Sequence, residues 1–287
     1  MFTAVSKIRG NALMYLLAQI HKLRIEYGDR CVTGTYPDSK RIERQLSQTG
    51  FFELLRVKSR APASKESRAT RYIKFKSAQR IFAERIGEVR AELLRDDLKM
   101  PPFVGRTIFR ALGEAMTNVN HHAYFRKSFL NPKAAEGLRG RWWLFGSLDV
   151  KRNIFTLVFY DCGVGIPKTL PRKYSVELIR EYLSLLPGFN PDDGQMISAA
   201  MALGRTRTEL DNRGKGLLDL ARLIDQVGAG QMQIFSRHGT YTYTGLGSAH
   251  KNGQGFVEGT LIEWRLPLDR AVEALSQDLQ DEAQNDA

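Results

Sequence analysis

The chain has 287 residues, and its 43 Lys and Arg against 31 Asp and Glu give a formal charge of +12 at pH 7. A hydrophobic content of 43% excludes global disorder, and two cysteines are too few for a disulfide framework or a cysteine-rich zinc site. No apolar run approaches the roughly 18–20 residues of a membrane span, and the N-terminus lacks the pattern of an export signal. We therefore expect a cytoplasmic protein with no membrane partner.

The positive charge is unevenly distributed. Most of the excess lies at 56–80, where nine basic residues accompany one acidic residue. We interpret this block as a solvated connector, because Pro62 and several Ser and Ala interrupt it, while binding of nucleic acid is the alternative. The pattern predicts four regions: a small α/β region at 1–58, a basic connector with a long helix at 59–100, a domain at 101–270 and an acidic tail at 271–287.

The first region alternates between two kinds of pattern. Apolar spacing predicts helices over 11–27 and 39–48, and strands are expected over 30–35 and 51–57. The segments GNALMYLLAQIHKL, VTGTYP and IERQLSQTGFFELL resemble the middle of a STAS-type domain, the fold of anti-sigma-factor antagonists. The resemblance covers only this stretch and lacks the opening strands of that domain.

The region at 101–270 mixes helices with adjacent strands. We expect a long helix at 77–98, ahead of this region. Within the region we expect one helix over 103–122 and another over 217–226. Strands are expected over 141–150, 153–160, 231–236 and 259–266. Adjacent antiparallel strands with helices between them indicate an α+β sandwich rather than a doubly wound sheet.

Candidate site residues lie on the helix expected over 103–122. Glu114, Asn118 and His122 are spaced by four residues, which places them on one helix face. The amide oxygen of Asn118 is a hard ligand for a divalent ion, and the Glu114 carboxylate is a candidate base. The same pattern also fits an ordinary polar helix face. His121 and His122 have no further ligand at the spacing of a zinc site, which argues against zinc.

A second motif follows the strand expected over 153–160, where Asp161 and two alternating glycines, Gly163 and Gly165, end an apolar run. A buried aspartate is unfavourable unless a group donates a hydrogen bond to it, and the exocyclic amine of a base is such a donor. Glycines let the backbone approach a flat ligand closely. A strand that ends in a glycine-rich turn is the alternative, and Cys162 is interpreted as a small buried spacer.

Two weaker motifs lie nearer the C-terminus. Gly214, Lys215 and Gly216 precede an amphipathic helix, whose first N–H groups and dipole favour a phosphate. The segment is neither a P-loop nor a dinucleotide fingerprint. Thr260 enters the last apolar strand, which alone indicates nothing beyond a strand.

The order of these four motifs resembles the GHKL superfamily of ATPases. E-x-x-x-N on a helix, D-x-G-x-G after a strand, G-K-G-L opening a helix and G-T starting the last strand occur together over about 100–268. The superfamily includes gyrase, histidine kinases, MutL-type repair ATPases, the ninety-kilodalton heat-shock chaperone and anti-sigma-factor kinases. The resemblance implies a Bergerat-type α/β sandwich, in which helices cover a mixed sheet and ATP binds between them.

The resemblance also implies roles for single residues. Asn118 would bind the Mg²⁺ that bridges the phosphates, and Glu114 would orient or deprotonate the attacking nucleophile. Asp161 would accept a hydrogen bond from the adenine amine, assisted by Thr260. The remaining matched residues would make room for the nucleotide or hold its phosphates: Gly163, Gly165, Gly214, Lys215 and Gly216. Residues 166–213 would form a mobile ATP lid that carries Arg205, Arg207 and Arg213, and Leu218 departs from the family pattern.

Among the branches, the anti-sigma-factor kinases are nearest, because they are compact and work with STAS partners. His21 fits a phosphoacceptor histidine poorly. A transducer-type lysine, as in the gyrase branch, would have to come from Lys215 or from a partner. We expect a Mg²⁺-dependent ATP-binding enzyme that hydrolyses ATP or phosphorylates a protein, STAS-like or encoded nearby; a homodimer is left open. The alternatives are a nucleotide-gated interaction module without turnover and an ATP-dependent nucleic-acid factor that uses 56–80.

Overall fold

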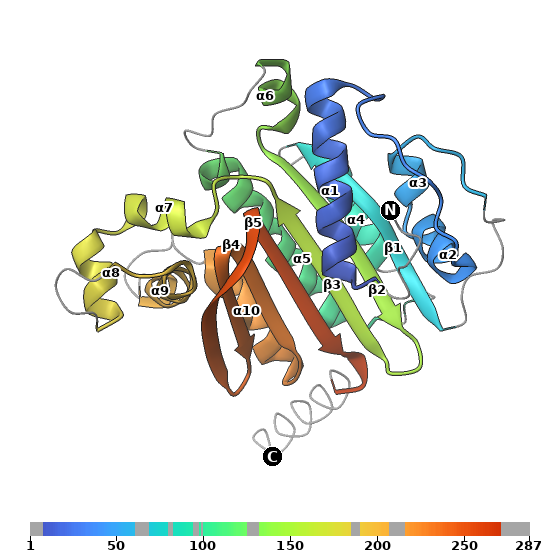
Figure 1. The fold of residues 1–287 in the computed structure, drawn as a ribbon. Helices are drawn as coiled ribbons and strands as arrows, with labels where there is room; N and C mark the ends of the chain where they lie inside the picture. The colour runs from blue at the N-terminus through green and yellow to red at the C-terminus, as the bar shows by residue number, and fades with distance from the viewer. Residues whose placement is uncertain are drawn as a thin grey trace, which may run out of the picture.

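One five-stranded sheet organises the molecule (Figure 1). The computed structural model describes residues 8–60, 69–79, 83–93, 98, 100–124, 132–184, 190–206 and 216–270. The strands are β1 (Thr70–Gln79), β2 (Arg141–Asp149), β3 (Ile154–Asp161), β4 (Gln231–Thr244) and β5 (Gly247–Pro267), in the order β1-β2-β3-β5-β4. Every pairing among them is antiparallel. The α+β class is therefore confirmed, whereas the expected mixed sheet is wrong for the described strands, because hairpins join β2 to β3 and β4 to β5.

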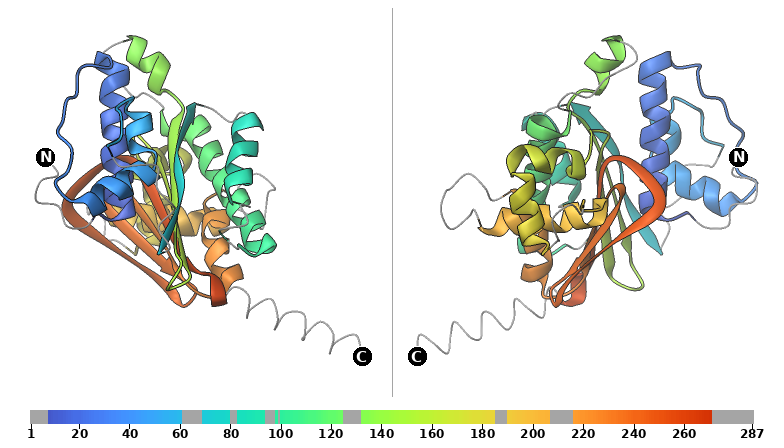
Figure 2. Two further views of the ribbon diagram at one scale, coloured as in Figure 1. Left: turned by 90° about the vertical axis from the view of Figure 1, so that its right-hand side faces the viewer. Right: turned by 60° about the vertical axis from the view of Figure 1, so that its left-hand side comes forward.

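Helices cover both faces of the sheet. The helices are α1 (Gly10–Tyr27), α2 (Lys40–Gln48), α3 (Phe51–Leu54), α4 (Ala83–Leu93), α5 (Pro102–Asn118), α6 (Pro132–Leu138), α7 (Ile166–Lys173), α8 (Val176–Tyr182), α9 (Asp193–Thr206) and α10 (Gly216–Val227). Figure 2 shows α1 and α2 on one face of the sheet and α4 and α5 on the other. The central strands β2 and β3 are accordingly buried along almost their whole length. Their near-continuous apolar runs reflect this, since a strand with one wet face would alternate.

The N-terminal segment packs onto this sheet through α1. Leu13 and Leu17 are fully buried in the same apolar core as Trp143 and Trp264. Polar contacts accompany them: the indole Nε1 of Trp143 donates to Nδ1 of His21 at 3.1 Å. Burial, together with nearby arginines, lowers the pKa of His21 to about 4, so this ring is neutral at pH 7.

Both strands expected in the first region are wrong. Residues 30–35 form no strand with the described residues and are mostly exposed, so they lack the buried face that a sheet strand would have. Residues 51–54 form the helical turn α3, which follows Gly50 in the left-handed conformation (φ 79°). A strand would send Phe51 and Phe52 to opposite faces, but only one side here meets the core, and the helical turn buries both rings.

The block at 56–80 is only partly a connector. Residues 70–79 form the edge strand β1, which buries Ile73 and Phe75 against the sheet. The helix expected over 77–98 is therefore wrong at its start, and α4 occupies 83–93 within that range. Several of the described basic side chains have acidic neighbours: Lys74 lies 2.8 Å from Glu53, Arg56 lies 2.9 Å from Asp29, and Arg60 lies 3.1 Å from Glu43. Residues 61–68 and the tail at 271–287 lie outside the described residues.

The other expected elements are confirmed. The helix expected over 103–122 is α5, and a π-helical turn, η2 (Val119–Ala123), continues it. The strands β2 and β3 and the helix α10 match their expected bounds within one residue, while β4 and β5 extend into a long hairpin. No helix in the described part of the chain is both long enough and apolar enough to cross a membrane.

Candidate functional site

A cavity of about 580 Å³ lies between the helices α5, α7, α9 and α10 and the strands β3 and β5. This volume is within the range of small-molecule sites, about 300–1,000 Å³. Five of the predicted site residues line it: Glu114, Asn118, Asp161, Gly165 and Thr260. Of the others, Gly163 and Gly216 are not among the lining residues, and Gly214 and Lys215 lie outside the described residues.

The strands supply a buried polar pair. Asp161 ends β3 and stands directly opposite Thr260 of β5 in the antiparallel register. The two residues are 5% and 8% exposed, respectively. One carboxylate oxygen of Asp161 accepts a hydrogen bond from the backbone N–H of Gly163 at 2.8 Å, which holds the carboxylate at the end of the strand. A ligand that donates a hydrogen bond could approach this pair from the cavity.

The glycines after Asp161 have a packing role. A Cβ atom at Gly163 would overlap the carbonyl oxygen of Ala123, which accepts a hydrogen bond from the N–H of Val164 at 2.7 Å. Gly165 has φ 87°, and a Cβ atom there would lie 2.6 Å from Oγ of Ser236. Close packing therefore explains both positions, and their contribution to nucleotide binding stays a prediction.

The helix α5 and the turn η2 supply the catalytic candidates. Glu114, Asn118 and His122 all line the cavity, as their spacing predicts. Burial raises the pKa of the Glu114 carboxyl and the nearby Asp219 adds to this, whereas Lys173 and His121 act in the opposite direction. Burial also lowers the pKa of His122, which favours the neutral ring.

The same helix leaves one amide unsatisfied. Nδ2 of Asn118 is buried and makes no hydrogen bond of normal geometry within the described chain, although its proximity to the Glu114 carboxylate lowers the pKa of that group. A bound group could therefore satisfy this amide better than Glu114 does. Among the described residues, no group of three or more His, Cys, Asp or Glu is arranged to hold a metal ion. A divalent ion held here would need oxygen ligands from a bound molecule in addition to Asn118.

Sequence reasoning missed two cations at this cavity. Arg172 and Lys173, in the last turn of α7, line its wall. A helix at this place is indicated by Pro167 near its start and by Arg172 and Lys173 at its end, because proline favours the first turn of a helix and basic residues favour the last. Three arginines were expected in the lid. Arg205 belongs to α9, and the structure describes its backbone only. Arg207 and Arg213 lie outside the described residues.

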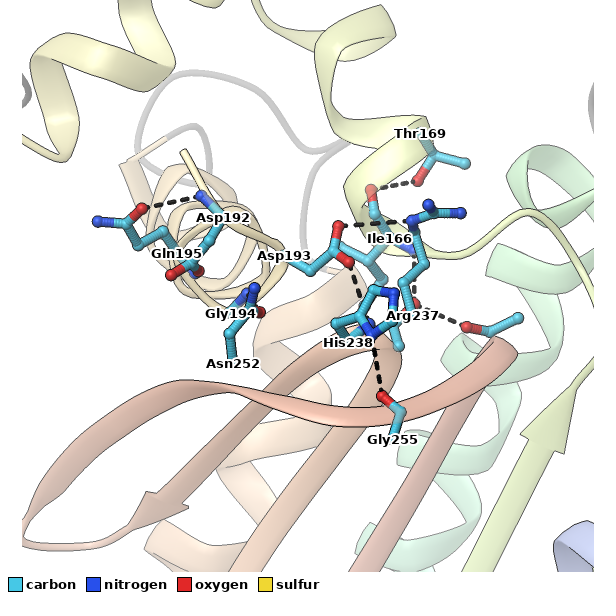
Figure 3. A network of polar contacts seen from close by, with 12 residues as sticks. Ile166, Thr169, Asp192, Asp193, Gly194, Gln195, Arg237, His238, Asn252 and Gly255 are labelled. Atoms are coloured by element: carbon cyan, nitrogen blue, oxygen red, sulfur yellow. Dashed lines mark hydrogen bonds and ion pairs between the residues drawn. The ribbon is translucent and has the colours of Figure 1, made fainter. Parts of the chain in front are cut away.

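The start of α9, which forms another wall, is anchored to the β4–β5 hairpin (Figure 3). Asp193 lies 3.4 Å from Nε of Arg237 and accepts a hydrogen bond from the backbone N–H of His238 at 3.0 Å. The N–H of Gly194 donates to Asn252 at 3.0 Å. A Cβ atom at Gly194 would lie 2.7 Å from the carbonyl oxygen of Lys251, so helix and hairpin meet closely. The hairpin thus positions the cavity residues Ala200 and Gly204 of α9.

We expect Asp193→Ala to lower the free energy of unfolding by about 1–3 kcal/mol, because Arg237 and the N–H of His238 lose their acceptor. Amide hydrogen exchange should rise most in α9. Asp193→Asn, which keeps an acceptor oxygen, should show a smaller loss. Unchanged exchange in α9 for Asp193→Ala would show that this contact does not anchor the helix.

No model of a known protein family matches the chain, and no curated protein is significantly similar to it. The site is therefore interpreted from its residues and its geometry.

Proposed function

We propose that the protein binds Mg²⁺-ATP in this cavity and hydrolyses it or transfers its γ-phosphate to a protein partner. One observation carries the proposal: a buried acceptor pair, Asp161 and Thr260, and a carboxylate–carboxamide pair, Glu114 and Asn118, line a single cavity of nucleotide size. These are side chains from three of the four sequence motifs; the remaining motif, at 214–216, lies largely outside the described residues. They come from elements far apart in the sequence, which makes a chance meeting in one cavity less expected.

The base would bind beside Asp161, where apolar side chains offer a surface for a flat ring. Phe159, Ile262 and Leu220 line the cavity with this carboxylate. A buried carboxylate accepts hydrogen bonds only, so it favours a ring that presents an amine over one that presents a carbonyl oxygen. Adenine meets this requirement at its exocyclic nitrogen.

The phosphates would lie toward α5. Mg²⁺ is commonly held by one or two protein oxygens together with substrate phosphates and water, which suits a site with Asn118 as ligand. Bound there, the ion would neutralise charge on the phosphates. The raised pKa of Glu114 makes its carboxylate a better proton acceptor than an exposed one, so this residue would take the proton of the attacking water or hydroxyl.

The nucleic-acid alternative has less support. This alternative rested mainly on the block at 56–80. Four of its six described basic side chains, Arg56, Arg60, Lys74 and Lys76, lie within 4 Å of an acidic partner. Pairing of this kind reduces the charge available to a phosphate backbone. The gated-module alternative shares the same cavity and differs only in turnover.

The test of the base pocket is Asp161→Asn. We expect it to weaken ATP binding by about 10- to 150-fold, because a charge-assisted hydrogen bond is worth about 1.5–3 kcal/mol. Preference for ATP over GTP should fall as well, and isothermal titration calorimetry with both nucleotides and Mg²⁺ measures both effects. Asp269→Asn, which changes an exposed carboxylate outside the cavity, is the control. Equal binding of ATP and GTP by the wild type, or a silent Asp161→Asn, would overturn this placement of the base.

A further inference from the structure

The last turn of α7 brings positive charge to the cavity wall. This helix begins directly after Gly165, at the end of the strand that carries Asp161, and ends at Lys173. Its end is held in place by the next residue: the Tyr174 hydroxyl donates to the carbonyl oxygen of Leu203 in α9 at 3.1 Å. The Lys173 ammonium lies 5.8 Å from the centre of the Tyr174 ring, within the range of a cation–π contact. The backbone at the end of α7 is therefore held against α9, and the exposed Lys173 side chain lines the cavity from there.

Lys173 lies electrostatically close to the proposed base. Burial is the largest influence on the pKa of Glu114 and raises it, and the charge of Lys173 is the strongest opposing influence. For His122, burial lowers the pKa and Lys173 is the next cause in the same direction. Lys173 also lines the cavity together with both of these groups, so its charge acts where Glu114 and His122 lie.

Phosphoryl transfer is helped by a cation beside the γ-phosphate, the group whose attack Glu114 would assist. In hydrolysis the water oxygen bonds to the γ-phosphorus and its proton passes to Glu114. The bond between the γ-phosphorus and the bridging oxygen breaks, and its electron pair leaves with ADP. Negative charge then develops on the γ-phosphoryl oxygens and the bridging oxygen, and a fixed cation stabilises it.

We propose that Lys173 is the catalytic cation that contacts the γ-phosphate, so that the chain supplies this charge from α7 rather than from Lys215, a later domain or a partner. The inference rests on the proposed function, since it names a residue of that same site. It predicts that the lysine distinguishes a nucleotide with a γ-phosphate from one without it.

The test compares Lys173→Met with Lys168→Met. Lys168 is on the same helix but is exposed and does not line the cavity, which makes it a matched control. Calorimetry on the full chain, with Mg²⁺, would measure binding of ADP and of a non-hydrolysable ATP analogue. We expect Lys173→Met to weaken binding of the analogue about tenfold, at the lower end for a charged hydrogen bond because Lys173 is exposed to solvent, and to leave ADP binding unchanged. Lys168→Met should leave both affinities unchanged.

Each outcome decides between the two proposals. Lys173→Arg should restore most of the preference for the analogue, and thermal unfolding of each variant checks that the fold is kept. If the wild type binds nucleotide but Lys173→Met weakens ADP and the analogue equally, or neither, this inference is wrong and the proposed function stands. A shift of the preference in Arg172→Met alone would assign the role to Arg172 instead. If the wild type binds neither nucleotide, both proposals fail.

Discussion

Replacing Glu114 by alanine is expected to lower the rate of ATP turnover by about 10²- to 10⁴-fold, the usual contribution of a general base. Binding of Mg²⁺-ATP should change little, because the proposed role of this carboxylate begins when the nucleophile loses its proton. Asn118→Ala should behave differently and weaken binding itself, because it removes a metal ligand one helical turn away. Steady-state kinetics together with calorimetry separates the two effects.

Glu136→Ala is a suitable control, since this glutamate is exposed on α6 and does not line the cavity. Loss of binding in Glu114→Ala with no effect of Asn118→Ala would show that the two roles are assigned the wrong way round. Tight binding by the wild type without turnover, alone or with any protein partner, would replace the enzyme by the nucleotide-gated interaction module.

The second large effect is expected for Gly259→Ala, which should lower the free energy of unfolding by at least about 3 kcal/mol. Gly259 has φ 82°, a conformation that residues with a side chain rarely adopt, and a Cβ atom there would overlap the carbonyl oxygen of Asp161. Relief of the overlap would move Asp161 and Thr260 apart. We therefore expect nucleotide binding to fall together with stability.

Chemical denaturation of both variants measures this effect. Gly255→Ala, in the same strand, is the matched control, because a Cβ atom at Gly255 meets no atom within 4 Å. A Gly259→Ala protein as stable as Gly255→Ala would mean that β5 and the end of β3 do not approach each other as closely as described.

The parts of the fold that could be predicted are those whose sequence pattern is local. The apolar runs that form β2 and β3 have a turn between them, and α5 and α10 have helical spacing, so each was found at nearly its observed position. The strand β1 was missed because its short alternation of Ile73, Lys74 and Phe75, which fits a half-buried strand, lies inside a basic block interpreted as a connector. The acidic partner of Lys74, Glu53, is 21 positions away, and no local pattern indicates that pairing.

The candidate site could likewise be predicted only where its residues follow a local pattern. Glu114 and Asn118 could be predicted to lie together from helical spacing alone, and Asp161 from its place at a strand end. Lys173 could not, because Pro167 and Pro171 are typical of an irregular segment, whereas Pro167 sits near the start of α7 and Pro171 is accommodated within it. That these residues share a cavity depends on long-range packing of α7 and α9 against the sheet.

The packing of α1 against β5 also means that α1 cannot reach its final contacts until much of the chain has been synthesised. Lys22 in α1 pairs with Glu258 in β5 at 2.6 Å, and 236 positions separate them in the chain. A ribosome that adds about 5–20 residues per second needs roughly 10–50 s to make that stretch. Throughout this interval Leu13 and Leu17, which are fully buried in the finished protein, have no complete sheet to cover. Helix α1 must therefore be kept from aggregating, by its own charges or by a chaperone, until β5 emerges.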